Sequence, residues 1–206
     1  MARMTCCDAF AVGVYRALID PLVWPLRRRI VRLCRERAVR DVIDIASATG
    51  AQCRLLARAG MTVTGIDLSE AMITSAGRRG GRDVHYVCGS AFHLPFADDS
   101  FDASLLLLAL HEHNEEERKQ MLVEALRVVR PDGRLLIADY TIPSHWRFHL
   151  PWQTIWLIER LAGADHLAGF RDFVARGGLV GLLARHSLSP VLQMGSHFGA
   201  IGIAVI

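Results

Sequence analysis

Two aspartates that end neighbouring apolar runs are the first residues in the chain whose placement suggests ligand chemistry. Asp44 is followed by a turn of small residues, Ala46–Gly50, and Asp67 ends the next run 23 positions later. Small side chains let a ligand approach the backbone of the turn and the helix that follows it. A carboxylate at the end of the second run is placed to accept hydrogen bonds from the two hydroxyls of a ribose. An ordinary strand-to-helix turn, with Asp67 as a helix N-cap, is the alternative interpretation.

The elements that must position these residues alternate along the chain. Apolar runs predict strands at 42–45, 63–67, 84–88, 105–108 and 135–139, and helical patterns fill 51–59, 70–77 and 115–129. This order predicts a parallel sheet with helices on both faces. Because the strand ends meet at one sheet edge, Asp44, Asp67 and Ser90, each 23 residues from the next, are expected to gather there. The runs 190–194 and 200–206 are too close for a crossover helix and predict an antiparallel hairpin.

Composition limits the remaining classes of protein. The chain has 206 residues, 51% of them hydrophobic, and a net charge of +3, which favours one globular domain and no nucleic-acid partner. The arginines between Arg27 and Arg40 lie in a helical pattern, so we expect a solvated arginine face, with peripheral membrane contact left open. No apolar run reaches the ~20 residues of a membrane span. Five cysteines without a C-x-x-C pair, and no recognisable signal peptide, predict a reducing cytoplasm.

Four segments carry a resemblance to a known family. "VIDIASATG", "VTGIDLSEAM", "GSAFHLPFADDSFDAS" and "EALRVVRPDGRLLIADY" resemble the class I S-adenosylmethionine-dependent methyltransferases, closest to the type 11 group of ubiquinone and menaquinone C-methyltransferases. The resemblance implies an α/β, Rossmann-like methyltransferase fold with a mostly parallel seven-stranded sheet. It also implies S-adenosyl-L-methionine as cofactor and S-adenosyl-L-homocysteine as product. The single domain would comprise an N-terminal helical cap (1–40), a cofactor-binding core (41–140), a helical substrate lid (141–187) and a terminal hairpin (188–206).

The resemblance also implies which residues hold the cofactor. The predicted set, from the N-terminus onward, is Tyr15, Asp44, Ala46, Ser47, Ala48, Gly50, Asp67, Leu68, Met72, Ser90, Ala91 and Leu108. The turn would hold the methionine part, Asp67 the ribose, and Leu68, Met72, Ser90 and Ala91 the adenine. Tyr15 would close over the cofactor.

Two departures from the family pattern leave an alternative open. Ala46 and Ala48 replace the first two glycines of the usual Gly-x-Gly-x-Gly turn, and Ser90 replaces an aspartate. A serine hydroxyl accepts a hydrogen bond more weakly than a carboxylate does. The alternative is a methyltransferase-fold protein that binds a ligand or partner without methyl transfer.

Residues after the fourth and fifth strands are expected to face the transferred methyl group. His111 is the predicted base or substrate-orienting group, because histidine exchanges a proton near neutral pH. Tyr140 is the second predicted catalytic residue, and the predicted substrate-binding residues are His111, Glu112, His113, Tyr140 and His145. Alternatively, His111 and Glu112 only cap the helix that starts near Glu115.

No metal site is predicted. His145 and His149 are four residues apart, but the sequence shows no third ligand for them. Tryptophans and phenylalanine between 146 and 156 favour a small, apolar or aromatic acceptor, although helix packing would use the same residues. A nicotinamide-dependent oxidoreductase is a rival class, but its glycine fingerprint is missing at 46, 48 and 51.

Overall fold

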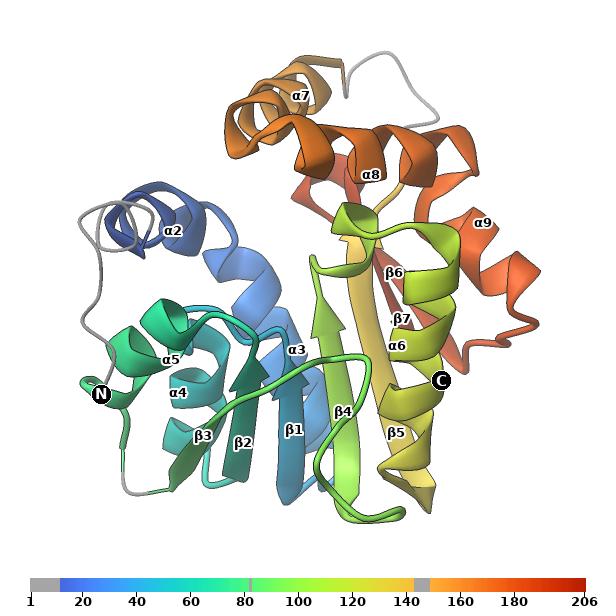
Figure 1. The fold of residues 1–206 in the computed structure, drawn as a ribbon. Helices are drawn as coiled ribbons and strands as arrows, with labels where there is room; N and C mark the ends of the chain where they lie inside the picture. The colour runs from blue at the N-terminus through green and yellow to red at the C-terminus, as the bar shows by residue number, and fades with distance from the viewer. Residues whose placement is uncertain (1–11, 82, 143–148) are drawn as a thin grey trace.

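Seven strands form one sheet in the order β3-β2-β1-β4-β5-β7-β6 (Figure 1). The structure is a computed structural model that describes residues 12–81, 83–142 and 149–206. Its strands are β1 (Asp41–Ile45), β2 (Thr62–Asp67), β3 (Val84–Cys88), β4 (Phe101–Leu107), β5 (Val129–Tyr140), β6 (Leu192–Ser196) and β7 (Ile201–Val205). β1 to β5 are parallel, with Val42 opposite Val63 on one side and Ala103 on the other. The predicted parallel core is confirmed.

The end of the chain reverses the strand direction. β7 pairs antiparallel with both β5 and β6, and the turn η4 (His197–Gly199) joins the two final strands. The predicted hairpin is therefore confirmed. β7 also inserts its fully buried residues between β5 and β6, which completes the hydrophobic core at this side of the sheet.

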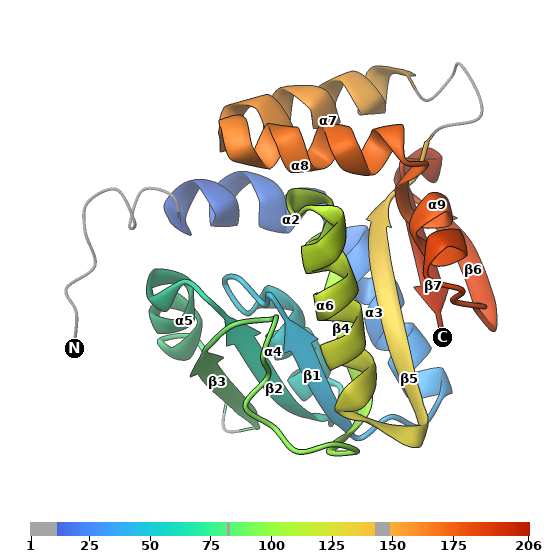
Figure 2. The same cartoon turned by 45° about the vertical axis from the view of Figure 1, so that its right-hand side comes forward.

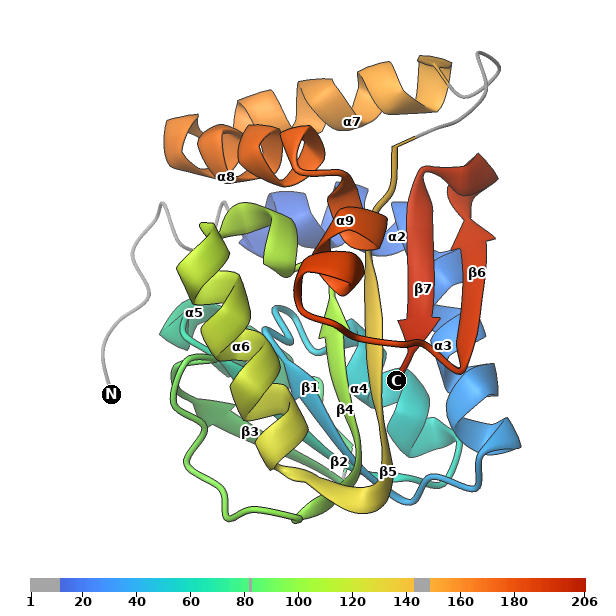
Figure 3. The same ribbon diagram turned by 90° about the vertical axis from the view of Figure 1, so that its right-hand side faces the viewer.

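Helices cover both faces of the sheet (Figure 3). α3 (Trp24–Glu36) and α4 (Ala51–Arg58) lie on one face, and α6 (Glu115–Arg127) and α9 (Gly178–Arg185) on the other. α5 (Glu70–Gly77) packs against β2 and β3. α3 buries an apolar stripe that includes Ile30 and Leu33, and Arg28, Arg29 and Arg32 are exposed, as predicted. Arg27 differs from the predicted solvated face, because it is buried and pairs with Asp20. Among the described helices, none is long and apolar enough to cross a membrane.

Short and long helices lie beyond the carboxyl ends of β1 to β5 (Figures 1 and 2). On one side are η1 (Tyr15–Ile19) and α2 (Asp20–Leu22), and on the other α7 (His149–Ala162) and α8 (Ala164–Ala175). α8 packs on α7 and on the turn η2 (Leu110–Glu112), which follows β4. The edge where Asp44 and Asp67 end their strands is therefore covered by two helical segments from distant parts of the chain.

The segment around Val129 differs from the sequence prediction. Helix α6 ends at Arg127, and β5 begins at Val129, which pairs with Phe101 before a shift in register. The Pro131–Gly133 stretch, predicted as a separating turn, lies inside this long irregular strand. The register passes from Val129 opposite Phe101 directly to Arg134 opposite Ala103, so residues 130–133 form a bulge where the turn was predicted.

Candidate active site

The small-residue turn after β1 has a left-handed backbone at three alternate positions. Ala46, Ala48 and Gly50 have φ angles of 58°, 46° and 68°. Glycine adopts this conformation without strain, while an alanine methyl group crowds the following carbonyl. Gly50 is needed for a second reason, because a Cβ atom there would collide with the Tyr86 ring. The turn therefore keeps the glycine backbone although two of its positions are alanine.

Asp67 at the end of β2 is tied to this turn. Its Oδ2 accepts a hydrogen bond from the Ala48 N–H at 2.8 Å, and its Oδ1 accepts one from the Ser69 N–H at 2.9 Å. Burial raises the pKa of Asp67, and these two N–H groups oppose that rise. The N-cap of α5 is Ser69, whose side chain accepts from the Met72 N–H, so Asp67 is free of the capping role. Each carboxylate oxygen can accept a further hydrogen bond.

A narrow pocket lies beside the turn, between β1, β4 and the N-terminal helices. Its lining consists of Tyr15, Val23, Leu26, Arg27, Asp44, Ala46, Ser47, Leu107 and Leu108. Five of these belong to the predicted cofactor set. Burial raises the pKa of Asp44 to about 6 although the Cys53 thiol lies 3.2 Å from its Oδ2, and burial raises that of Tyr15 to about 12.

Asp20 fixes the N-terminal helices over this pocket. Its two carboxylate oxygens accept hydrogen bonds from Arg27 at 2.7 Å and from the Thr49 hydroxyl at 2.8 Å. The cover and the turn are thus joined through one side chain.

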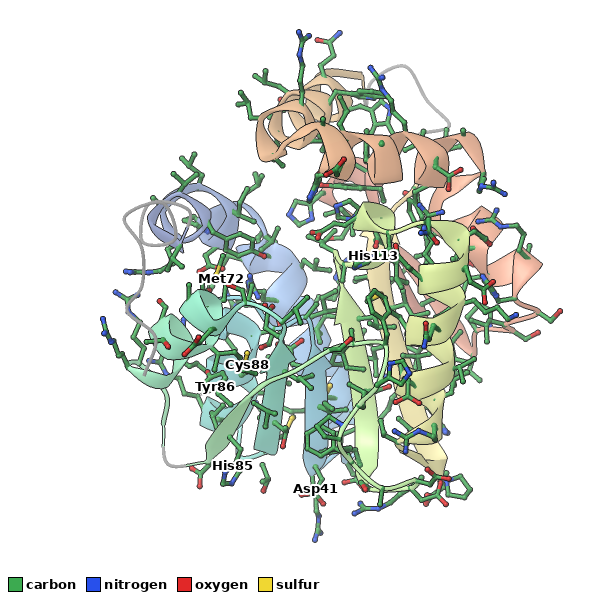
Figure 4. The ribbon with its side chains drawn as sticks, in the orientation of Figure 1. Asp41, Met72, His85, Tyr86, Cys88 and His113 are labelled. Atoms are coloured by element: carbon green, nitrogen blue, oxygen red, sulfur yellow. The ribbon has the colours of Figure 1, made fainter. Side chains whose placement is uncertain are left out.

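The residues predicted for the adenine lie at the other end of the turn. Leu68 is 73% exposed. Met72 on α5 and Cys88 at the end of β3 lie toward the carboxyl edge of the sheet, away from Asp41 and His85 (Figure 4). Ser90 accepts a hydrogen bond from the Phe92 N–H at 3.1 Å. A flat ligand at this edge would have one open side.

A second polar cluster lies under α7 and α8. The His111 Nδ1 is 2.9 Å from Asp139 Oδ1, and its Nε2 is 3.6 Å from Glu159 Oε1. Glu159 Oε1 accepts a hydrogen bond from the Tyr140 hydroxyl at 2.7 Å, and its Oε2 lies 2.6 Å from His166 Nε2. His111, Asp139 and Glu159 are buried, whereas the His166 side chain is 26% exposed.

The charged groups of this cluster shift one another's pKa values. Burial alone would lower the pKa of His111, but Asp139 and Glu159 raise it to about 9. Burial would raise the pKa of Glu159, yet the neighbouring His166, His111 and Tyr140 lower it overall. Asp139 also accepts hydrogen bonds from the backbone N–H groups of Leu110, His111 and Tyr140. These bonds hold Asp139, and through it the His111 ring, in one orientation.

His111 and Glu112 do not cap α6. That helix begins with a reciprocal pair in which the Asn114 side chain accepts from the Glu117 N–H and the Glu117 side chain accepts from the Asn114 N–H, each at 3.0 Å. His113 lies near the start of α6, with its ring edge-to-face on Phe92 (Figure 4). His145 lies outside the described residues.

Two members of the cluster, Glu159 and His166, were missed by sequence reasoning. Glu159 is an isolated acid in an apolar helix, which was the one available signal. Their contact with His111 depends on the packing of α8 against η2. Gly169 allows this approach, because a Cβ there would meet the Glu112 carbonyl. The fully buried Arg118 then joins the two elements by donating to the carbonyls of Leu110 and Gly169.

The sheet order, the reversed final hairpin and the turn locked to Asp67 define the Rossmann-like methyltransferase fold. An O-methyltransferase family protein from Burkholderia thailandensis has this fold, with a TM-score of 0.72 over 96% of this chain and 59% of that one, at 18% identity.

The sequence comparisons specify the family. Residues 43–137 match the family described as "Methyltransferase domain", type 11. A demethylmenaquinone methyltransferase from Paenarthrobacter aurescens is 38% identical over 117 residues, which cover 57% of this chain and 45% of that protein. A demethylmenaquinone methyltransferase from Thermotoga maritima is 37% identical over 124 residues, which cover 59% of this chain and 53% of that protein. The chain spans about half the length of these curated relatives. Over this matched part, the chain is similar to the S-adenosylmethionine-dependent methyltransferases, in the group that includes the demethylmenaquinone methyltransferases.

Proposed function

We propose that the chain transfers a methyl group from S-adenosyl-L-methionine to a small, apolar or aromatic acceptor. The observation that carries the proposal is the bond between Asp67 and the Ala48 N–H, which holds a left-handed turn and a ribose-type carboxylate together at the strand edge. A cationic donor also suits the buried carboxylate of Asp44 beside the same turn. When bound, the donor supplies an electrophilic methyl group and leaves as S-adenosyl-L-homocysteine.

The cofactor would lie along the strand edge from the pocket to α5. Asp44, Ala46, Ser47, Ala48, Gly50 and Leu108 would hold the methionine part, and Tyr15 would cover it. Asp67 would bind the ribose, while Leu68, Met72, Ser90 and Ala91 would surround the adenine. The open face of Leu68 and the pocket between Tyr15 and Asp44 support this direction.

The reacting end would lie toward the cluster around His111 and Tyr140. Both ring nitrogens of His111 face carboxylates, so its proposed part is to orient the acceptor and not to take the acceptor's proton directly. Tyr140 would line the same space. Glu112, His113 and His145 complete the proposed acceptor site. Displacement at a methyl group depends mainly on such positioning.

The aromatic surroundings of this cluster support the acceptor class. Tyr140, Trp152 and Trp156 all pack against Phe170, with ring centroids 4.9–6.0 Å apart. Phe170 and Tyr140 are buried in this packing, so the half-buried rings of Trp152 and Trp156 would meet a planar apolar molecule. The curated relatives are named for demethylmenaquinone, which fits that class.

In this proposal, each segment of the chain has a separate role. Residues 1–40 would act as a cap over the donor, 41–140 as the cofactor-binding core, 141–187 as the substrate lid and 188–206 as the closing hairpin, in one domain located in the cytoplasm.

One observation favours a second candidate function, ligand binding without methyl transfer. The alanines at 46 and 48 are held at strained φ angles, and the Ser90 hydroxyl is engaged with the Phe92 N–H, so neither end of the donor site matches the family pattern.

Calorimetric titration tests the proposal. Purified protein is titrated with S-adenosyl-L-methionine, with S-adenosyl-L-homocysteine, and with a nicotinamide dinucleotide as control. Micromolar binding of the two sulfur compounds alone is expected, followed by methyl transfer to a planar apolar acceptor. Binding without transfer to any acceptor favours the second candidate, and folded protein that binds neither sulfur compound refutes the first.

A further inference from the structure

Three donor groups of the cluster converge on one point. One ring nitrogen each of His111 and His166 and a carboxylate oxygen of Glu159 lie within 4.8 Å of one another. They come from three separate elements, η2, α8 and α7. Two imidazoles and a carboxylate form a donor set that zinc and other divalent transition metals use in proteins.

The spacing of the donors approaches that of a tetrahedral site. Ligands about 2.1 Å from one zinc ion are about 3.4 Å apart, and two imidazoles bound to it have ring centres about 5 Å apart. Here His111 Nε2 is 3.6 Å from Glu159 Oε1, and the rings of His111 and His166 are 5.4 Å apart, inclined by 70°. The 2.6 Å between His166 Nε2 and Glu159 Oε2 is shorter, so the half-buried His166 ring would move by about 1 Å to admit an ion.

The surrounding bonds prepare His111 and Glu159 as ligands. Asp139 accepts from His111 Nδ1, which directs Nε2 toward Glu159, and a cation bound there would take the place of the Nε2 proton. A carboxylate partner on the far nitrogen is the usual support of a metal-binding histidine. Tyr140 orients the Glu159 carboxylate from the other side. Glu159 Oε2 is buried and faces His166 Nε2 at 2.6 Å, so a cation would bind between these two atoms.

We propose that His111, Glu159 and His166 form a three-ligand site for a divalent transition-metal cation, with a fourth position open on the exposed side of His166. A site with three protein ligands and one open position is typical of metals that bind a substrate or water. The site differs from the sequence expectation of no metal, which considered only His145 and His149. It would lie close to the cofactor pocket, because Leu108 lines that pocket and η2, which carries His111, begins two residues later. An acceptor oxygen in the open position would be oriented by the cation.

Zinc binding is measured on untagged, chelator-treated protein without any methyl donor, so the result is independent of the proposed methyl transfer. We expect one equivalent of Zn²⁺ by calorimetry and a matching rise in melting temperature. Co²⁺ in place of Zn²⁺ is expected to give the visible absorption of a tetrahedral ion. His166→Ala should weaken Zn²⁺ at least 100-fold, and Asp139→Asn by 10–100-fold.

Controls separate the site from surface binding and from misfolding. His93→Ala removes an exposed histidine outside the cluster and should leave Zn²⁺ affinity unchanged. His166 is partly exposed, so its alanine variant is expected to fold, as circular dichroism would show. Wild-type protein that binds no Zn²⁺, or a folded His166→Ala variant that binds it as tightly as wild type, overturns the proposal. The two histidines and the buried carboxylates would then form only a structural polar network.

Discussion

Replacing Ala48 by glycine should stabilise the protein, although glycine usually destabilises a fold. An alanine in the left-handed region carries about 1–2 kcal/mol of strain. Glycine removes that strain but loses about 0.5–1 kcal/mol more conformational entropy on folding. With φ angles of 46° at Ala48 and 58° at Ala46, the expected net gain is about 0.5 kcal/mol for each substitution. The double variant should therefore gain about 1 kcal/mol, or about 2–4 °C in melting temperature for a chain of this size.

Two further alanines provide matched controls. Ala38 has a φ angle of 54° and lies after α3, outside the pocket lining, so Ala38→Gly should gain as much stability as Ala48→Gly. Ala57 is inside helix α4, where the same substitution should lose about 0.5–1 kcal/mol.

Urea unfolding with linear extrapolation measures these changes. Titration with S-adenosyl-L-methionine then distinguishes the relief of backbone strain from the removal of a methyl group beside the proposed donor site. Ala48→Gly should tighten S-adenosyl-L-methionine binding severalfold, because it removes a methyl group beside the proposed donor site, while Ala38→Gly should leave the affinity unchanged. If Ala48→Gly loses stability as Ala57→Gly does, the argument that the turn is strained is refuted.

Three other substitutions test different parts of the structure. Asp67→Asn should raise the dissociation constant for the donor about 10–100-fold by weakening charge-assisted hydrogen bonds, and an unchanged affinity in calorimetry would contradict the ribose placement. The pKa of Asp44 is raised to about 6, so the folded state holds one more proton than the unfolded state between about pH 4 and 6. The free energy of unfolding should therefore fall by about 3 kcal/mol as the pH rises through that window. Asp44→Asn should abolish that fall, as unfolding curves at several pH values would show. Arg118→Met should cost about 3 kcal/mol, because Arg118 is fully buried and pairs with Asp172. Arg176→Met breaks an exposed pair with the same Asp172 and should cost much less, so equal losses in urea unfolding would contradict the role of burial.

Local patterns in the sequence were sufficient to predict the sheet and the position of the Asp67 carboxylate at its edge. The run ending at Asp67, the small turn after Asp44 and the final hairpin all depend on residues a few positions apart, where periodicity and turn chemistry act directly. The same local reasoning failed at Val129, because pairing with a strand 28 residues earlier decided its conformation.

The left-handed φ angles of Ala46 and Ala48 lie between these cases. The family resemblance indicated glycine at these two positions, and only the structure showed that the alanines keep the left-handed conformation.

Tertiary structure alone assembled the second cluster. Glu159 and His166 are 48 and 55 residues from His111, and no spacing rule connects them. Their meeting depends on Gly169 allowing α8 onto η2 and on Arg118 joining the two elements. The physical reason is that apolar packing between helices brings them together without regard to sequence distance, and the polar groups then meet wherever that packing leaves them. The sequence therefore determined the fold and the sheet edge where we propose that the donor binds, while the packing of α7 and α8 decided which residues surround His111.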